Sequence, residues 1–352
     1  MPITTAQDLR DHIDLAIRVE LATVPPYLFA MYSLVDQESL AALLIKSIVA
    51  EEMLHAVLAT NLLLAVGGEP RFDTTDYIPS YPGLLPHHQP PMELNLAPCS
   101  TGLIRDVFMR IEQPEIHGAP AEPDNFESLG QFYHALERAI EGLAATSDLF
   151  AEPQRSRQLA DPSFYTPVQF DAEDSGGLAM VDSPESARDA IEVIVHQGEG
   201  LSTDRWADPS HQELTHYHKL LQIADGSVAM GGVIGLAVNP RSADYPAGLA
   251  AVSDLFNASY RAVFLTMDDL FGPTVDKAPG VARLYRLMMN VMAPVARFLV
   301  TQPLPERGVA APTFETYRFS SESWLIELGS LSAAAAAVYP ELGDVAAAVA
   351  EL

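Results

Sequence analysis

Residues 40–66 read LAALLIKSIVAEEMLHAVLATNLLLAV. The stretch is apolar on every helical face, so it predicts a helix that is surrounded either by protein or by lipid. Lys46, Glu51, Glu52 and His55 interrupt the run, and a charge at the centre of a membrane span costs about 3 kcal/mol. We therefore expect a helix buried inside a folded bundle. A carboxylate buried there needs a partner, a proton or a metal ion.

The spacing of the polar residues in this helix favours the metal ion. Glu52 and His55 are three residues apart and share one helical face. Glu-x-x-His is the spacing by which carboxylate-bridged di-iron bundles bind metal from one helix. A core ion pair would also explain the two residues. However, the same spacing recurs at Glu213 and His216.

Two further glutamates complete a repeated set. Glu20 lies in the apolar ladder of the first expected helix, and Glu199 lies at the apolar edge of a later one. Glu20 is 16 residues before Asp36 and Glu52 is 15 residues after Gln37, so in antiparallel helices both carboxylates lie about 23 Å from the turn. Glu199 and Glu213 are each 7 residues from Trp206.

The chain thus presents Glu and Glu-x-x-His twice, which is the ligand composition of four-helix di-iron proteins. Oxygen-rich ligation with two imidazoles suits iron, with manganese as the alternative. Two such ions about 3.5–4 Å apart could bind dioxygen or peroxide. The predicted metal ligands are Glu20, Glu52, His55, Glu199, Glu213 and His216.

Other residues compete for these positions. Glu192 and His196 share much of the helical face of Glu199, and either could replace it. Glu213 could instead form a capping box with Ser210. An alternative set flanks the apolar stripe of the expected helix 126–146: His134, Glu137 and Glu141.

The remaining polar candidates are expected to have other roles. Glu51 is interpreted as an acid beside the ligand set or at the surface, Glu112 as a helix-end residue, and His87 and His88 as exposed loop residues. The candidates for hydrogen bonds to the ligands are Tyr27, Tyr217 and His218, although the tyrosines could simply be core aromatics.

Helical periodicity dominates the chain, so we predict an all-α protein with long proline-rich loops. Pro25 and Pro26 should kink or divide the first helix, 7–35, and the box 124–127 should cap the helix 126–146. Phe72, Tyr77, Tyr81 and Leu84 should anchor the loop 69–98 over a pocket. The remaining expected helices are 39–66, 100–112, 184–200, 210–226, 250–270, 279–300, 320–338 and 341–351. We expect a bundle at 1–225 and a packed helical region at 226–352.

Composition narrows the functional classes. Of 352 residues, 48% are hydrophobic, and 47 acidic against 20 basic residues give a formal net charge of −27. Such a surface disfavours nucleic acid and anionic membranes as partners. The single cysteine, Cys99, excludes an internal disulfide and a thiolate-rich metal site. The N-terminal stretch has no signal-peptide pattern, so we expect a cytoplasmic protein that could form a homo-oligomer.

Four segments resemble the ferritin-like domain of the iminophenyl-pyruvate dimer synthase family. They read AIRVELATVPPYLFAMYSL, AEEMLHAVLATNLLLAVGGEP, IVHQGEG and ELTHYHKLLQI. The resemblance covers about residues 5–225. It implies a ferritin-like four-helix bundle whose two irons per chain are held by the six residues predicted above. Family members in violacein biosynthesis are far longer, so the resemblance implies the fold more than the substrate.

These expectations combine into one functional hypothesis. The protein should be a non-haem di-iron oxidoreductase that activates dioxygen or peroxide on a small amine, amino-acid-derived or aromatic metabolite. The alternatives are a metal-binding ferritin-like protein without catalysis and a structural bundle that holds no metal. The number of metal ions per chain distinguishes the three.

Overall fold

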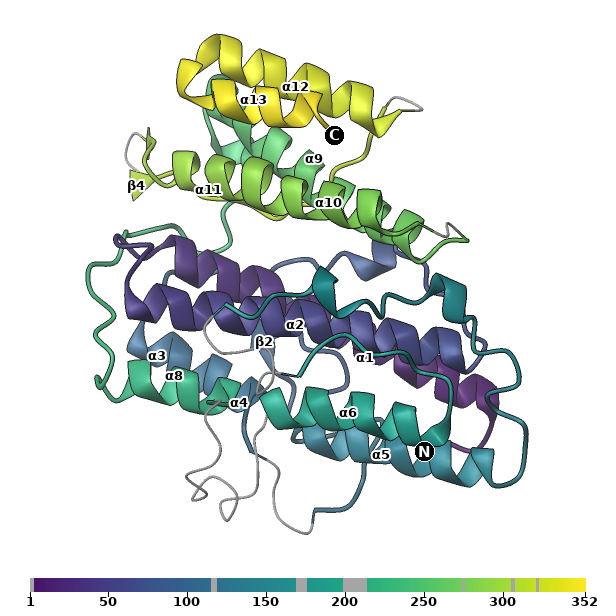
Figure 1. Cartoon of the computed structure of the whole chain (residues 1–352). Coiled ribbons are helices and arrows are strands. Elements are labelled where there is room, and N and C mark those ends of the chain that lie inside the picture. Colours follow the sequence, from purple (N-terminus) through teal and green to yellow (C-terminus); the bar gives the residue numbers. More distant parts are fainter. Residues whose placement is uncertain are drawn as a thin grey trace.

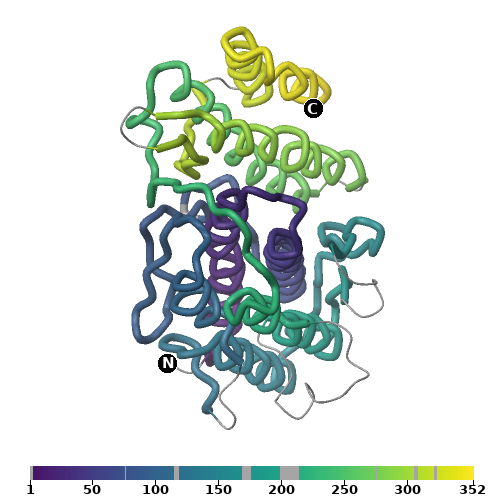
Figure 2. Tube along the Cα trace, turned by 90° about the vertical axis from the view of Figure 1, so that its left-hand side faces the viewer, coloured from purple at the N-terminus to yellow at the C-terminus, as the bar shows by residue number. Residues whose placement is uncertain are grey.

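A computed structural model describes residues 3–114, 119–168, 176–198, 214–273, 276–304, 308–320 and 323–352. The described chain is mainly helical, as predicted, and its helices are stacked in layers (Figure 1). The long pair α1 (Ala6–Tyr32) and α2 (Leu40–Ala65) lies in the middle. Shorter helices cover one side of this pair and the C-terminal helices cover the other, as the side view in Figure 2 also shows.

The shorter helices beside α1 and α2 complete the bundle. They are α3 (Thr101–Leu103), the π-helical segment η2 (Ile104–Phe108), α4 (Met109–Ile111), α5 (Leu129–Ala144), α6 (Pro184–Gly198) and α8 (His216–Ala224). The 3-10 turns of this half are Thr75–Tyr77, Arg155–Arg157 and Pro162–Phe164. A small antiparallel hairpin pairs β1 (Gly83–Leu84) with β2 (Glu93–Leu94).

The C-terminal layer is built around α9 (Ala247–Leu270). Against it pack α10 (Ala278–Arg286), the π-helical segment η6 (Leu287–Met292), α11 (Ala293–Leu299), α12 (Trp324–Val338) and α13 (Gly343–Ala350). The 3-10 turns here are Ser242–Asp244 and Pro340–Leu342, and a hairpin pairs β3 (Pro303–Leu304) with β4 (Gly308–Val309). The predicted domain boundary near residue 225 stays a prediction.

The sequence predicted that Pro25 and Pro26 would kink or divide α1. They do not divide it. Proline has no N–H, so Pro26 leaves the carbonyl oxygen of Ala22 without its helical donor. The hydroxyl of Tyr81 donates to that oxygen at 2.7 Å. Both prolines are also buried against the rest of the bundle. A side chain from the proline-rich loop thus replaces the missing backbone donor, and α1 continues to Tyr32.

Helix starts differ from the predictions where another cap is available. Ser128 and Gln131 form the capping box of α5, so the predicted box at 124–127 is wrong. Thr215 is the N-cap of α8, and its side chain accepts from the backbone of His218. The helix expected from Ser210 therefore does not run unbroken into α8, and its predicted first residues lie outside the described ranges.

The proline-rich loop, residues 69–98, packs against both the bundle and the C-terminal layer. Phe72 stacks on Phe271 at the end of α9, with ring centroids 5.7 Å apart, and Arg261 of α9 donates to the Phe72 carbonyl at 3.1 Å. Tyr81 contacts α1, as described above. Leu84 is 63% exposed, so its predicted anchoring role is wrong. Among the described helices, none is long and apolar enough to cross a lipid bilayer.

Candidate metal centre

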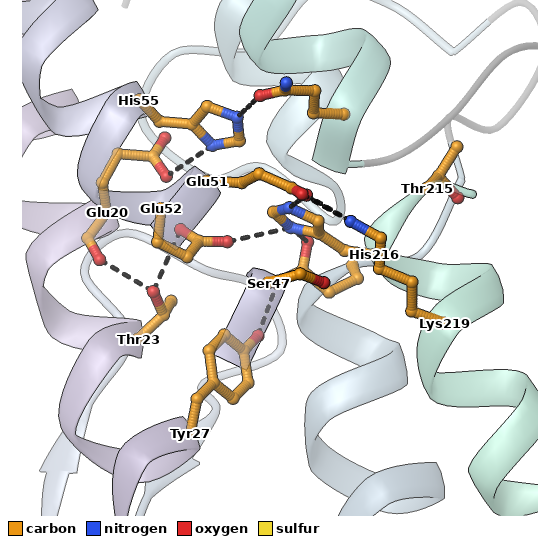
Figure 3. A network of polar contacts seen from close by, with 12 residues as sticks. Glu20, Thr23, Tyr27, Ser47, Glu51, Glu52, His55, Thr215, His216 and Lys219 are labelled. Atoms are coloured by element: carbon orange, nitrogen blue, oxygen red, sulfur yellow. Dashed lines mark hydrogen bonds and ion pairs between the residues drawn. The ribbon is translucent and has the colours of Figure 1, made fainter. Parts of the chain in front are cut away.

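Ionisable side chains from four elements meet in the centre of the bundle (Figure 3). Glu20 comes from α1, Glu52 and His55 from α2, Glu112 from the C-cap of α4 and His216 from the first turn of α8. All five side chains are at most 2% exposed. Their ligand atoms form two groups, each within 4.8 Å: Glu20, Glu52 and His55, and Glu52, Glu112 and His216. Glu52 belongs to both groups.

Both histidines direct the same ring nitrogen towards these carboxylates. Nδ1 of His55 lies 3.5 Å from Oε2 of Glu20. Nδ1 of His216 lies 3.0 Å from Oε1 of Glu52 and 3.3 Å from Oε2 of Glu112. The two imidazole rings are stacked, with centroids 5.4 Å apart and planes inclined by 25°. Glu52 therefore belongs to two similar carboxylate–imidazole groups, one with His55 and one with His216.

Glu112 is a member of this centre that sequence analysis did not select. It does end a helix, as expected, but its side chain is buried among the other ligand groups. The π-helical segment Ile104–Phe108 precedes it, and such insertions often occur at functional sites. Regular helical periodicity could not identify Glu112, because this segment changes the register of the turn before it.

Hydroxyl groups surround the carboxylates and orient them. Tyr27 donates to Oε1 of Glu112 at 2.5 Å, and Tyr133 of α5 donates to Oε1 of Glu20. The hydroxyl of Thr23 lies 3.1 Å from Oε2 of Glu52. Burial and the nearby charge of Glu112 raise the pKa of Tyr27 well above its usual range, so Tyr27 stays a donor at neutral pH. Tyr133 lies in the helix expected at 126–146 and was not selected as a candidate from the sequence.

Mutual repulsion between the carboxylates changes their proton affinity. Burial, together with the charges of Glu112 and Glu20, raises the pKa of Glu52 well above its usual range. Burial opposes the charged form of His216, but Glu112 and the other acidic neighbours outweigh it and raise the pKa of His216. For Glu20, the contacts with His55 outweigh burial and lower the pKa. Without metal, protons on Glu52 and His216 offset the excess of negative charge.

A buried ion pair lies behind His216. Nε2 of His216 is 2.8 Å from Oε2 of Glu51. Nζ of Lys219 donates to both oxygens of Glu51, at 2.6 and 2.5 Å. Lys219 is fully buried, and sequence analysis did not single it out. The signal was present, because His216, Lys219, Leu220 and Ile223 form one buried stripe at helical spacing along α8.

Several sequence candidates lie elsewhere or outside the described residues. Glu199 and Glu213 fall in the range 199–213 and are not described. Glu192 is exposed and His196 is half-buried on α6. His218 and Tyr217 stack edge to face on α8, and Nδ1 of His218 lies 2.9 Å from the hydroxyl of Thr215.

The histidines of α5 and of the proline-rich loop also lie apart from the metal centre. His134 and Glu137 pair with each other at 3.4 Å on the partly exposed side of α5, and Glu141 pairs with Arg188. His87 is partly exposed, as expected, but His88 is buried, contrary to expectation. Nδ1 of His88 lies 2.7 Å from the carbonyl oxygen of Pro90. The polar contact and the Phe126 ring beside it hold His88 inside the loop.

A pocket opens on the carboxylates from the side of α5 and α6. It is narrow, with room among the described residues for about one water molecule. The lining consists of Glu20, Glu52, His55, Glu112, Leu129, Tyr133, Ile194, Val195 and Gly198. The proline-rich loop, which was expected to cover a pocket over the site, contributes no residue to this lining within the described ranges. Apolar side chains of α5 and α6 instead form the wall opposite the carboxylates.

The donor set fits divalent iron or manganese. Three buried carboxylates and two imidazoles converge, and Glu52 is placed to serve two ions. Two cations would balance the carboxylate charge that protons otherwise offset. The outer nitrogen of each imidazole has an oxygen partner, which is the usual arrangement behind a metal-bound histidine.

Comparisons with known proteins agree with this architecture. A ferritin-like family model matches residues 13–225. Dichlorochromopyrrolate synthase from Lentzea aerocolonigenes is 25% identical over an alignment 381 positions long, which covers 89% of this chain and 36% of that protein. The chain therefore spans about a third of this relative's length.

A solved structure shows a similar fold. The crystal structure of a ferritin-like protein from Caulobacter vibrioides has a TM-score of 0.58 and 24% sequence identity, and covers 82% of this chain and 96% of its own. The narrower resemblance to iminophenyl-pyruvate dimer synthases stays a prediction. The family model spans more than half of the chain, and the protein belongs to the ferritin-like family.

Proposed function

We propose that this protein is a non-haem di-iron oxidoreductase that uses dioxygen or peroxide to oxidise a small amine, amino-acid-derived or aromatic metabolite. The observation that carries the proposal is the pair of buried carboxylate–imidazole groups that share Glu52. Buried carboxylates that repel one another lower the stability of a metal-free bundle, so folding alone does not explain them.

The residues that would hold the two ions are Glu20, Glu52 and His55 on one side and Glu52, Glu112 and His216 on the other. Glu199 and Glu213 remain proposed additional ligands. Iron bound there would supply the redox chemistry that the side chains themselves lack. Tyr27 and Tyr133 orient Glu112 and Glu20 by hydrogen bonds, so each carboxylate keeps one oxygen directed by a phenol.

The side chains that line the pocket suit an apolar or aromatic substrate. Leu129, Ile194 and Val195 form an apolar wall beside the carboxylates, and Tyr133 adds an aromatic ring. Such a wall excludes water from the reacting groups and contacts a flat or apolar molecule. The relative from Lentzea aerocolonigenes is named as a synthase of dichlorochromopyrrolate. That name supports a role in secondary metabolism, with a substrate that this chain's own pocket selects.

Metal loading followed by exposure to air tests the proposal. The metal-free protein would be loaded with iron(II) under anaerobic conditions, and its metal content and absorbance would be measured before and after air is admitted. We expect two irons per chain and a new absorption band in the near-ultraviolet or visible range. The matched control is Glu52→Gln, which preserves side-chain volume and removes the shared carboxylate.

Stoichiometry separates the alternatives. Many irons per chain would indicate storage, and a protein that binds no iron and melts at an unchanged temperature on iron(II) addition would indicate a structural bundle. Two irons without any absorbance change in air, with dioxygen or with peroxide, would contradict the oxidoreductase assignment and leave a metal-binding protein.

A further inference from the structure

The two carboxylate–imidazole groups differ in what stands behind each histidine. Nε2 of His55 lies 2.9 Å from Oε1 of Gln197, which is a neutral amide. Nε2 of His216 lies 2.8 Å from a carboxylate oxygen of Glu51. Figure 3 shows Glu51 between His216 and Lys219. The Nδ1 atoms of both histidines face carboxylates, but the partners of their Nε2 atoms differ.

A carboxylate behind an imidazole makes the ring a stronger metal ligand than an amide does. The acceptor charge stabilises the N–H bond dipole, fixes the tautomer and raises the basicity of the other nitrogen. Lys219 holds Glu51 in place for this contact, because its Nζ donates to both carboxylate oxygens. Both residues are at most 2% exposed, so solvent screens their interactions little.

The pocket approaches the two groups unequally. Its lining includes Glu20 and His55 together with the shared Glu52 and Glu112. Among the described residues that line it, neither His216 nor the pair Glu51 and Lys219 is included. The small open space beside the carboxylates therefore borders the His55 group, whereas His216 is enclosed by protein.

We propose that the two metal positions are unequal. The position between Glu52, Glu112 and His216 holds its ion tightly because Glu51 and Lys219 fix the His216 ring. The position between Glu20, Glu52 and His55 binds more weakly, exchanges its ion and faces the incoming substrate. Lys219 is then a positioning residue for the tight site. This inference rests on the proposed di-metal function and assigns different tasks to its two halves.

Calorimetric titration of the metal-free, full-length protein tests the inference without measuring turnover. The probes are manganese(II) and, under anaerobic conditions, iron(II). We expect two binding steps whose dissociation constants differ at least tenfold. Glu51→Gln places behind His216 the same amide that stands behind His55. It should weaken the tight step about 10–100-fold, so that the two steps merge.

A matched variant tests the metal position that contains His55. Gln197→Leu should weaken the second step and leave the first step unchanged. Lys219→Met should weaken the first step in the same direction as Glu51→Gln. Because Lys219→Met leaves a buried carboxylate without its cation, the double variant Glu51→Gln/Lys219→Met provides the same test without an unpaired charge. Circular dichroism would verify that each variant is folded.

The outcomes distinguish this inference from the proposed function. Two ions bound with equal affinity by the unchanged protein would overturn the inequality and leave the di-metal site intact. So would a Gln197→Leu variant that weakens the first step as much as Glu51→Gln does. A chain that binds neither manganese(II) nor iron(II) would overturn the proposed function itself, and the inference with it.

Discussion

The bundle and the C-terminal layer bury different kinds of polar group. At the centre of the bundle, Glu20, Glu52 and Glu112 lie close enough to repel one another. In the C-terminal layer a cluster of neutral side chains is buried at α9: Ser253, Asn257 and Thr313. The side chain of Asn257 donates to Thr313 at 2.8 Å and accepts from the backbone N–H of Glu315 at 3.0 Å. The Ser253 hydroxyl lies 3.0 Å from that of Thr313.

The difference shows which polar groups serve folding. In the C-terminal layer the side chains of Ser253, Asn257 and Thr313 bond to one another or to the backbone, so this cluster fixes the loop 311–315 against α9 at little electrostatic cost. The buried Lys277 of that layer meets the carbonyl oxygens of Leu270 and Gly272 at the end of α9. In the bundle, protons must offset the carboxylates unless cations do. We therefore expect these residues to lower the stability of the metal-free bundle, as the proposed metal centre requires.

The largest expected effect comes from Glu52→Gln. The variant should lose both metal positions, since Glu52 belongs to each. At a metal concentration a hundred times the dissociation constant, each site contributes about 2.7 kcal/mol, so the loss should approach roughly 5 kcal/mol of stabilisation. The measurement is the melting temperature with and without iron(II). The metal-free variant should melt no lower than the metal-free parent, because a repulsive carboxylate is gone.

A metal-free Glu52→Gln protein that melts well below its parent would contradict this difference between the bundle and the C-terminal layer. That result would mean that Glu52 supports folding as the neutral cluster in the C-terminal layer does.

Asn257→Ala should produce the opposite pattern. The change removes the acceptor of the part-buried Glu315 N–H, which costs about 1–3 kcal/mol, whereas the Thr313 hydroxyl keeps its contact with Ser253. Unfolding by urea should show lower stability with and without metal, while the metal stoichiometry stays at the parent value. Ser330→Ala, on the exposed side of α12, is the matched control and should be neutral. Loss of metal binding in Asn257→Ala would link the two layers energetically and contradict their separation.

The pH dependence of metal-free stability sharpens the contrast further. Burial and the neighbouring carboxylates raise the pKa of Glu52 above its ordinary value of 4.5. Below that value Glu52 is neutral in both the folded and the unfolded chain. As pH rises, the unfolded chain releases the proton first, so this group lowers stability by up to about 1.4 kcal/mol per pH unit until the folded pKa is reached.

The advantage of metal-free Glu52→Gln over its parent should therefore widen between pH 4 and 8. Melting temperatures of the two proteins across this range provide the measurement. An advantage that narrows as pH rises would show that Glu52 is ionised and paired in the folded protein.

The smallest expected effect concerns the single thiol. Cys99 is 3% exposed, and burial raises its pKa to about 12. Its backbone N–H donates to Ser33, just after α1, and its sulfur contacts Met230 in the segment that leads to the C-terminal layer. The thiol should react with a thiol reagent only at the rate of bundle opening, and metal should slow that rate. Rapid labelling at pH 8 would show that this edge of the bundle is open.

The sequence predicts four of the five residues that meet in the centre, because Glu20, Glu52, His55 and His216 follow simple helical periodicity. Glu52 and His55 share a helical face, and Glu20 falls at the matching height on its antiparallel neighbour. Glu112 could not be found in this way, since it follows a π-helical segment that changes the register of the preceding turn. Lys219 was overlooked because a lysine in an apolar stripe is normally read as solvent-exposed, and its partner Glu51 lies 168 residues away.

Other errors have a common physical cause, which is the choice between competing partners. Pro26 does not end α1 because Tyr81, distant in sequence, supplies the missing donor. The cap of α5 is Ser128 and not the earlier box, since both patterns occur within a few residues and packing selects one. Local patterns define what each segment can do, and contacts between distant segments decide which option is used.

Anomalous X-ray diffraction at the iron edge from crystals of the iron-loaded protein tests the central claim most directly. Two anomalous peaks should appear, one between Glu20, Glu52 and His55 and the other between Glu52, Glu112 and His216, with Glu52 adjacent to both. At limiting iron, the peak beside His216 should be the stronger. No peak at these carboxylates, or iron bound only at the protein surface, would contradict the account.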